Sequence, residues 1–254
     1  MCKVIVPLNA FNRNEVLEKD QASFISKIKT AGAYGVEIRR ELFPEGSPNL
    51  SSIKEELEKF PLFTVYSTPV EIWLEDGSIN LENLQKIFHE AKEMGASWIK
   101  VSLGHFNNNI SDGRLLKEFL EKESAIQLLV ENDQTKYGGS IRSFQSFFES
   151  VIKNDIPIKM TFDIGNWYYS GESVHEAIAP LKSHVMYLHL KHVENQDGHL
   201  ITLPLPADES AEWRKMVGQF PQGLNRALEI PIHTMEELSY YINLVESERE
   251  FAGK

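Results

Sequence analysis

Short apolar runs and longer amphipathic segments alternate along the whole chain. The short runs are rich in β-branched residues, as in strands covered on both faces, and they span residues 3–8, 35–39, 63–67, 98–103, 126–132, 158–163, 185–191 and 224–230. The longer segments carry apolar residues at helical spacing, and they span residues 14–30, 50–59, 80–93, 113–122, 140–153, 173–182, 209–219 and 235–249. Each run is followed by one such segment, so the pattern predicts eight strand–helix units.

The segment at residues 80–93 shows how the helices are identified. Its apolar side chains recur every three or four positions, as in Leu84, Ile87, Phe88 and Ala91, and Gly95 supplies a stop signal. The same period is absent from the short runs, which supports the two kinds of element.

Eight such units without a break in composition favour one closed (β/α)8 barrel. The chain has 254 residues, which is near the ordinary size of this architecture. An open doubly wound α/β sheet is the alternative, and periodicity alone does not exclude it. We find no linker, low-complexity tract or strong repeat, so residues 1–254 are predicted to form a single domain.

Composition and charge limit the partners. The hydrophobic fraction of 42% is typical of a globular protein, and the net charge of −11 disfavours binding to nucleic acid. The only cysteine, Cys2, allows no intrachain disulfide and no thiolate metal site. The N-terminal apolar run is too short for a signal peptide, and no stretch has the length of a membrane span. We therefore expect a cytoplasmic protein that binds neither membranes nor nucleic acid, and a homo-oligomer stays open.

Four consecutive strands carry a metal-ligand type of residue at or near their C-terminal ends. Glu131, Asp163 and Glu229 each follow an apolar run, and His189 lies within one. In a (β/α)8 barrel these strand ends form the active-site face. A carboxylate in an apolar run is costly unless it is paired or coordinated, although a single one often only begins a solvated loop. Three carboxylates and an imidazole suit Mn²⁺ or Mg²⁺, with Zn²⁺ and Co²⁺ as alternatives.

Five segments, in this order along the chain, carry a family resemblance. They read GAYGVEIR at 32–39, LLVEND at 128–133, FDIGNW at 162–167, YLHLKHV at 187–193 and ALEI at 227–230. They resemble the xylose isomerase-like TIM-barrel superfamily, in its sugar-phosphate isomerase/epimerase branch. The resemblance implies that Glu131, Asp163, His189 and Glu229 bind one divalent cation. It also implies that Glu131 and Glu229 act as the catalytic acid and base.

Three positions depart from the ketose 3-epimerases of that family. Asn166 stands where those enzymes have a histidine, Asn195 where they have an arginine, and His192 where they have an acidic residue. No glycine-rich phosphate loop is present in the sequence. The resemblance therefore implies the metal-binding barrel and leaves the particular substrate and its phosphorylation open.

The expected activity is isomerisation or epimerisation of a small polyhydroxylated substrate through an enediolate. A bound cation would polarise the carbonyl, and two carboxylates would take and return the proton. A sugar-acid or inosose-type dehydratase begins with the same deprotonation and is the alternative enzyme. A non-catalytic sugar- or metal-binding barrel is the alternative outside catalysis. An abasic-site endonuclease of the related barrel type is disfavoured by the net charge.

Four further residues are candidates for substrate binding, namely Glu37, Lys191, Asn166 and Trp167. Lys191 lies two positions after His189, so it shares a strand face. It could steady an oxyanion or a substrate carboxylate or phosphate, or it could neutralise an acidic mouth. Glu37 could bind a sugar hydroxyl or order Lys191. An ion pair with Arg39 is not expected along one strand face but is possible at the strand end. Trp167, with Tyr168 and Tyr169, is expected in a loop that walls the pocket or packs the barrel end. The histidines at 105, 192, 199 and 233 are interpreted as loop or surface residues.

Overall fold

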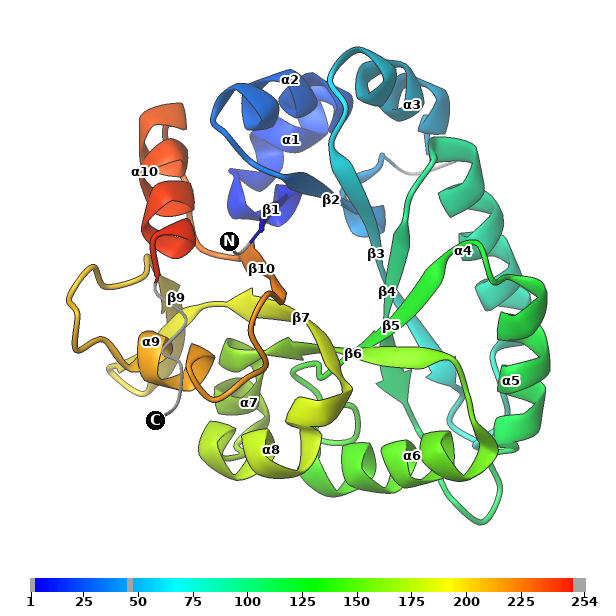
Figure 1. The fold of residues 1–254 in the computed structure, drawn as a ribbon. Helices are drawn as coiled ribbons and strands as arrows, with labels where there is room; N and C mark the ends of the chain where they lie inside the picture. Colours follow the sequence, from blue (N-terminus) through cyan, green and yellow to red (C-terminus); the bar gives the residue numbers. More distant parts are fainter. Residues whose placement is uncertain (1–2, 45–47, 249–254) are drawn as a thin grey trace.

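Eight parallel strands close into a barrel in the computed structural model, which describes residues 3–44 and 48–248 (Figure 1). The order around the barrel is β1-β10-β7-β6-β5-β4-β3-β2, and β1 pairs with both β2 and β10. The strands are β1 (Val4–Pro7), β2 (Gly35–Arg39), β3 (Phe63–Trp73), β4 (Trp98–Gly104), β5 (Gln127–Glu131), β6 (Ile158–Asp163), β7 (Val185–Leu190) and β10 (Asn225–Leu228). The closed barrel confirms the predicted architecture and excludes the open sheet.

Helices surround the barrel in Figure 1. They are α1 (Arg13–Lys19), α2 (Ala22–Thr30), α3 (Leu50–Lys59), α4 (Leu81–Met94), α5 (Gly113–Lys122), α6 (Ile141–Asn154), α7 (Ile164–Ser170), α8 (Val174–Leu181), α9 (Glu212–Val217) and α10 (Met235–Glu246). None of the helices in the described ranges is long and apolar enough to cross a membrane. Cys2 and the predicted helical residue at 249 lie outside the described residues.

The barrel interior changes from apolar to polar within two residues along the strands. One cluster inside the barrel consists of Ile5, Val65, Leu129, Tyr187 and Ala227. Side chains of a strand alternate between its faces, so the residues two positions further along face the same interior. Two positions beyond Leu129, Tyr187 and Ala227 come Glu131, His189 and Glu229, and β6 ends at Asp163. The apolar cluster therefore lies beneath the candidate site.

The predicted helix 14–30 is wrong as one element, because it breaks into α1 and α2. Asp20 ends α1 with a φ of +66°, a conformation that a continuous helix does not allow. The apolar period runs across the break, which is why the sequence did not reveal it. Closer to the C-terminus of the chain, the predicted helix 209–219 is shorter in the structure, since only Glu212–Val217 is helical.

Three elements were not predicted. β3 continues to Trp73 beyond the predicted end at residue 67, with a register shift between Ser67 and Glu71. α7 is helical where a loop was expected. A two-stranded antiparallel hairpin, β8 (His192–Gln196) and β9 (His199–Leu203), follows β7.

A buried polar contact joins the barrel to α4. The hydroxyl of Tyr66 donates to Glu90 Oε2 at 2.7 Å, and Arg40 donates to both oxygens of Glu90 at 2.8 and 3.0 Å. Burial favours the protonated acid, but hydrogen bonds from Arg40 and Tyr66 hold the pKa of Glu90 below its ordinary value. Glu90 therefore stabilises the fold as a carboxylate.

Glu90→Gln should lower the free energy of unfolding by about 2 kcal/mol, because Arg40 and Tyr66 lose a charged acceptor. Urea denaturation measures this, with Glu93→Gln on the exposed face of α4 as the matched control, expected within about 0.5 kcal/mol of wild type. A carboxylate with a lowered folded pKa stabilises above its unfolded pKa. The difference in unfolding free energy between the wild type and Glu90→Gln should therefore narrow as the pH falls below 4.5. An equal loss of unfolding free energy in Glu90→Gln and Glu93→Gln would contradict a stabilising role for the Glu90 carboxylate.

Candidate metal centre

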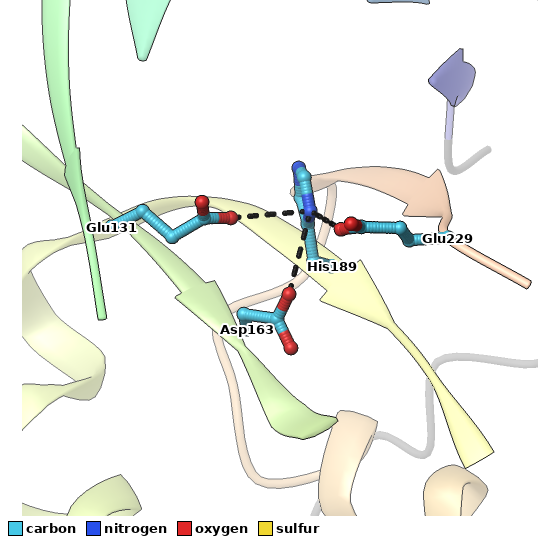
Figure 2. Close-up of side chains that lie close together, drawn as sticks. All are labelled: Glu131, Asp163, His189 and Glu229. Atoms are coloured by element: carbon cyan, nitrogen blue, oxygen red, sulfur yellow. Dashed lines mark hydrogen bonds and ion pairs between the residues drawn. The ribbon is translucent and has the colours of Figure 1, made fainter. Parts of the chain in front are cut away.

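Glu131, Asp163, His189 and Glu229 converge at the C-terminal end of the barrel. Each offers one ligand atom, and these four atoms all lie within 4.8 Å of one another. In Figure 2 the two glutamates lie on opposite sides of the imidazole, with Asp163 between them on a third side. The structure thus brings together all four residues that were predicted to bind the cation.

Nδ1 of His189 is the centre of the cluster. It lies 2.5 Å from Glu229 Oε2, 3.2 Å from Glu131 Oε1 and 3.6 Å from Asp163 Oδ2. Asp163 and His189 are fully buried, and the two glutamate side chains are 14% and 11% exposed. Three carboxylate oxygens around one ring nitrogen are an unfavourable grouping unless a cation joins them.

The residues fit a divalent cation. Two ligands on opposite sides of one ion lie about 4–4.5 Å apart, which is twice a metal–oxygen bond. A spread of up to 4.8 Å therefore needs only small side-chain shifts. The buried Oδ2 of Asp163 accepts no hydrogen bond, although it forms an ion pair with Lys191. Oxygen ligands with one imidazole suit Mg²⁺, Mn²⁺ and Zn²⁺, and the geometry leaves the metal unidentified.

Glu37 orients the imidazole from the opposite side. Its Oε2 lies 3.1 Å from Nε2 of His189 and accepts a hydrogen bond from the Tyr187 hydroxyl at 3.0 Å. A proton on Nε2 that is donated to Glu37 leaves Nδ1 free to bind a cation, the usual arrangement behind a histidine ligand. Glu37 is fully buried and contacts the imidazole at Nε2, whereas the three candidate carboxylate ligands lie around Nδ1. Its contact with a sugar hydroxyl stays a prediction.

Arg39 completes the environment of Glu37. Its NH1 lies 2.8 Å from Glu37 Oε1, and its Nε lies 2.7 Å from Glu41 Oε1. The ion pair thus forms at the end of β2, the place where the sequence left it possible. The two residues face the same interior of β2, and Arg39 is at the strand end, where its long side chain can fold back.

Lys100 is a site residue for which no role was predicted from the sequence. Its ammonium is 1% exposed and bridges Glu131 Oε1 at 2.8 Å and Glu37 Oε1 at 3.1 Å. It therefore joins a metal-ligand candidate to the residue that orients His189. A lysine inside the apolar run of strand 98–103 was the available signal, since a buried lysine requires paired carboxylates.

Lys191 and Asn166 join the network on the other side. Lys191 Nζ lies 2.8 Å from Asp163 Oδ2, 3.0 Å from Asn166 Oδ1 and 3.3 Å from Glu229 Oε1. Asn166 also donates from its side chain to the carbonyl of Asn132 at 2.9 Å. Both predicted substrate-binding residues therefore contact the carboxylates or the backbone that carries them.

Trp167 lies apart from this network. Its side chain is fully buried and packs against Phe162 and Phe144, with ring centroids 5.5 and 6.0 Å away. α7 begins directly after Asp163, so its fourth residue turns back toward the core. Of the two alternatives predicted for Trp167, the structure shows the packing position, and its predicted role in substrate binding has no support from this geometry.

Two asparagines also position the ligands, and neither was singled out from the sequence. Asn132 Oδ1 accepts from the amide of Asp163, and its Nδ2 donates to the Asp163 carbonyl, both at 2.9 Å. Asn9 donates to Glu229 Oε1 at 2.6 Å. The pair Glu131-Asn132 at a strand end was the only local signal for the first, and Asn9 gave none because it lies far away in the sequence.

The charges of the site depend on one another. Burial raises the pKa of Glu131, although Lys100 lowers it. Burial also disfavours an ionised Glu229, but Lys191 and His189 hold its pKa well below the ordinary value. Burial and Lys100 oppose a charged imidazole, yet Glu37, Glu131 and Glu229 raise the pKa of His189 well above the ordinary value. The carboxylates thus favour a positive charge at Nδ1, which a bound cation would supply in place of a proton.

A cavity of about 350 Å³, here called the mouth cavity, opens next to the centre. Its lining includes Glu229, Lys191, Asn9, Gln134, Thr202 and Ile232. The candidate ligand Glu229 therefore faces a space in which a small substrate can bind.

Glu37→Gln should weaken Mn²⁺ binding about 10- to 100-fold, because the imidazole loses its charged acceptor. Calorimetric titration of the purified variants with Mn²⁺ measures this. Glu41→Gln is the matched control, since Glu41 also pairs with Arg39 but is not among the contacts of His189. It should bind Mn²⁺ as wild type does. Equal affinities in both variants would contradict the positioning role of Glu37.

Comparisons with known proteins relate this chain to others through structure alone. No protein-family model matches the sequence, and no curated protein matches it. A xylose isomerase domain-containing protein from Salmonella typhimurium LT2 superposes with a TM-score of 0.71 at 14% identity, covering 95% of this chain and 94% of that one. An IolI protein with a bound zinc atom gives 0.70 at 11% identity, covering 98% and 100%. The 3-keto-D-glucoside 4-epimerase YcjR from E. coli gives 0.60 at 15% identity, covering 97% and 98%.

The chain therefore has the xylose isomerase-like TIM-barrel fold. The matching structures include sugar epimerases, a probable dehydratase and an AP endonuclease, so this fold carries several activities. The activity of this chain must accordingly be argued from its site.

Proposed function

We propose that the protein is a divalent-metal-dependent isomerase or epimerase of a small sugar or sugar derivative. The observation that carries the proposal is the convergence of Glu131, Asp163, His189 and Glu229, whose ligand atoms lie within 4.8 Å of one another beside the mouth cavity. Mn²⁺ or Mg²⁺ fits this donor set best, with Zn²⁺ and Co²⁺ as alternatives. The epimerases among the matching structures support the proposal as analogy.

The bound cation would supply Lewis-acid polarisation of the substrate carbonyl. Glu131 and Glu229 lie on opposite sides of His189, so they can face a substrate from two sides. One carboxylate takes the proton from the carbon next to the carbonyl, and the electron pair of that bond forms the enediolate. The other, protonated at the start, gives its proton back to the carbon. Asp163 and His189 hold the cation, and Glu37, Lys100 and Lys191 fix the ligands.

Metal-dependent exchange of a substrate C–H proton with solvent tests the proposal. The purified protein is stripped with chelator, reloaded with Mn²⁺ or Mg²⁺, and incubated in D₂O with a panel of ketoses, inososes and sugar acids. Deuterium at the carbon next to the carbonyl, seen by NMR only with metal, would support it. A product that has lost water would instead identify the dehydratase reaction. Absence of exchange across the panel at full metal occupancy would favour the non-catalytic binder.

A further inference from the structure

The polar lining of the mouth cavity is mostly uncharged. Among its described lining residues, Lys191 is the only lysine or arginine. An ammonium group has three N–H donors, and Asp163, Asn166 and Glu229 offer three acceptors at 2.8–3.3 Å. Lys191 is thus already engaged in two ion pairs and one hydrogen bond within the protein. A phosphate or carboxylate in the cavity would meet Glu229 without an unpaired lysine or arginine to balance it.

The remaining polar side chains of the lining suit hydroxyl groups. Apart from Glu229 and the exposed His233, they are the amides of Asn9, Asn12 and Gln134 and the hydroxyl of Thr202. Amide and hydroxyl groups both donate and accept, as the hydroxyls of a sugar do. The volume of about 350 Å³ is at the lower end for ligand pockets, which suits a ligand the size of one monosaccharide.

Thr202 comes from an element outside the barrel. It lies on β9 of the hairpin, and its Oγ1 is 3.1 Å from the hydroxyl of Tyr169 on α7. The same hydroxyl donates to the carbonyl of Leu200 at 3.4 Å. Because α7 begins directly after Asp163, Tyr169 ties the hairpin to the helix that follows a metal-ligand candidate.

Two further features fix the hairpin in place. Its turn has positive φ at Asp197 and Gly198, which matches the twist of a two-residue hairpin. At its base, α7 packs closely through Gly165. A Cβ there would lie 2.8 Å from Lys191 Cβ and 3.0 Å from Val193 Cγ2. The hairpin is therefore held against α7 and the end of β7, so Thr202 has a defined position in the cavity wall.

We propose that the β8–β9 hairpin is the specificity wall of the site and that the Thr202 hydroxyl, positioned by Tyr169, hydrogen-bonds a hydroxyl group of the ligand. Together with the uncharged amides of the mouth cavity and the paired Lys191, the wall favours an uncharged polyhydroxylated ligand over sugar phosphates and sugar acids. Thr202 is the specificity-determining residue and Tyr169 a positioning residue. The inference rests on the proposed function only in taking the ligand to be a carbohydrate.

Calorimetric titration of the Mn²⁺-loaded full chain tests this with four probes. D-fructose and xylitol are the neutral probes, and D-fructose 6-phosphate and D-gluconate are the anionic ones. We expect the wild type to bind a neutral probe at least tenfold more tightly than either anion. Thr202→Val should raise the Kd of that neutral probe about 3- to 10-fold, as expected for one lost hydrogen bond, whereas Thr202→Ser should stay within twofold.

Tyr169→Phe should raise the same Kd about threefold, and Tyr168→Phe, its exposed neighbour on α7, should not change it. Tighter binding of the anions, equal affinities of Thr202→Val and wild type, or no binding of any probe would overturn the inference. Failure of the proposed function has a different signature. In that case the neutral probes bind with the expected dependence on Thr202, but no C–H proton of a carbonyl probe exchanges with solvent.

Discussion

Glu131→Gln and Glu229→Gln should each lower kcat about 10²- to 10⁴-fold, even when excess Mn²⁺ restores occupancy of the centre. Each substitution removes a proton acceptor as well as a ligand charge, and added metal replaces only the second function. Steady-state turnover measured across an Mn²⁺ titration separates the two losses. Solvent-deuterium incorporation should survive in one variant while net conversion stops, because one carboxylate removes the proton and the other returns it.

Asp163→Asn is the matched control for this experiment. Asp163 lies in the same cluster, but the proposed mechanism gives it no proton to transfer. Its variant should therefore need more Mn²⁺ and then regain most of its turnover. Full activity of both Gln variants at saturating Mn²⁺ would refute the two-base mechanism. It would direct attention to another base, with Lys191, 3.3 Å from Glu229 Oε1, as the next candidate.

The barrel and its four candidate ligands were predictable because both can be inferred from local sequence patterns. Parallel strands buried on both faces give continuous apolar runs, and the strand ends of a barrel all point to one face. A polar residue such as Asp163 after such a run is therefore assigned to that face without knowledge of the packing. The five matching segments added the grouping of the ligands, and the structure brings them together.

The surroundings of the ligands were not predictable to the same extent, because they depend on contacts between distant strands. Glu37 and His189 are 152 residues apart, and only the closure of the barrel places Glu37 behind the ring. For Trp167 the sequence left a pocket wall and core packing open, and only the first turn of α7 decides for the core. The hairpin did have a local signal in Asp197-Gly198, since this dipeptide favours a two-residue turn, and the positive φ at both residues agrees with it.

The second large effect expected is on stability. Lys100→Met should lower the free energy of unfolding of the metal-free protein by about 3–5 kcal/mol. Methionine fills most of the same volume, but it leaves Glu37 and Glu131 without the ammonium that lies 3.1 and 2.8 Å from them. Burial opposes the charge on the lysine, yet Glu131 and Glu37 raise the pKa of Lys100 above its ordinary value, so the charge is present at neutral pH.

Denaturant unfolding measures this effect, and thermal unfolding with and without Mn²⁺ links it to the centre. A cation at Nδ1 of His189 would restore positive charge next to Glu131, so Mn²⁺ should raise the Tm of Lys100→Met more than that of the wild type. Lys159→Met is the control, because Lys159 is also on a barrel strand but is exposed. It should change the stability by less than about 0.5 kcal/mol. Similar losses in the two variants would show that the ammonium of Lys100 does not stabilise the buried carboxylates. A Tm rise with Mn²⁺ no larger than in the wild type would show that the cation does not bind beside Glu131.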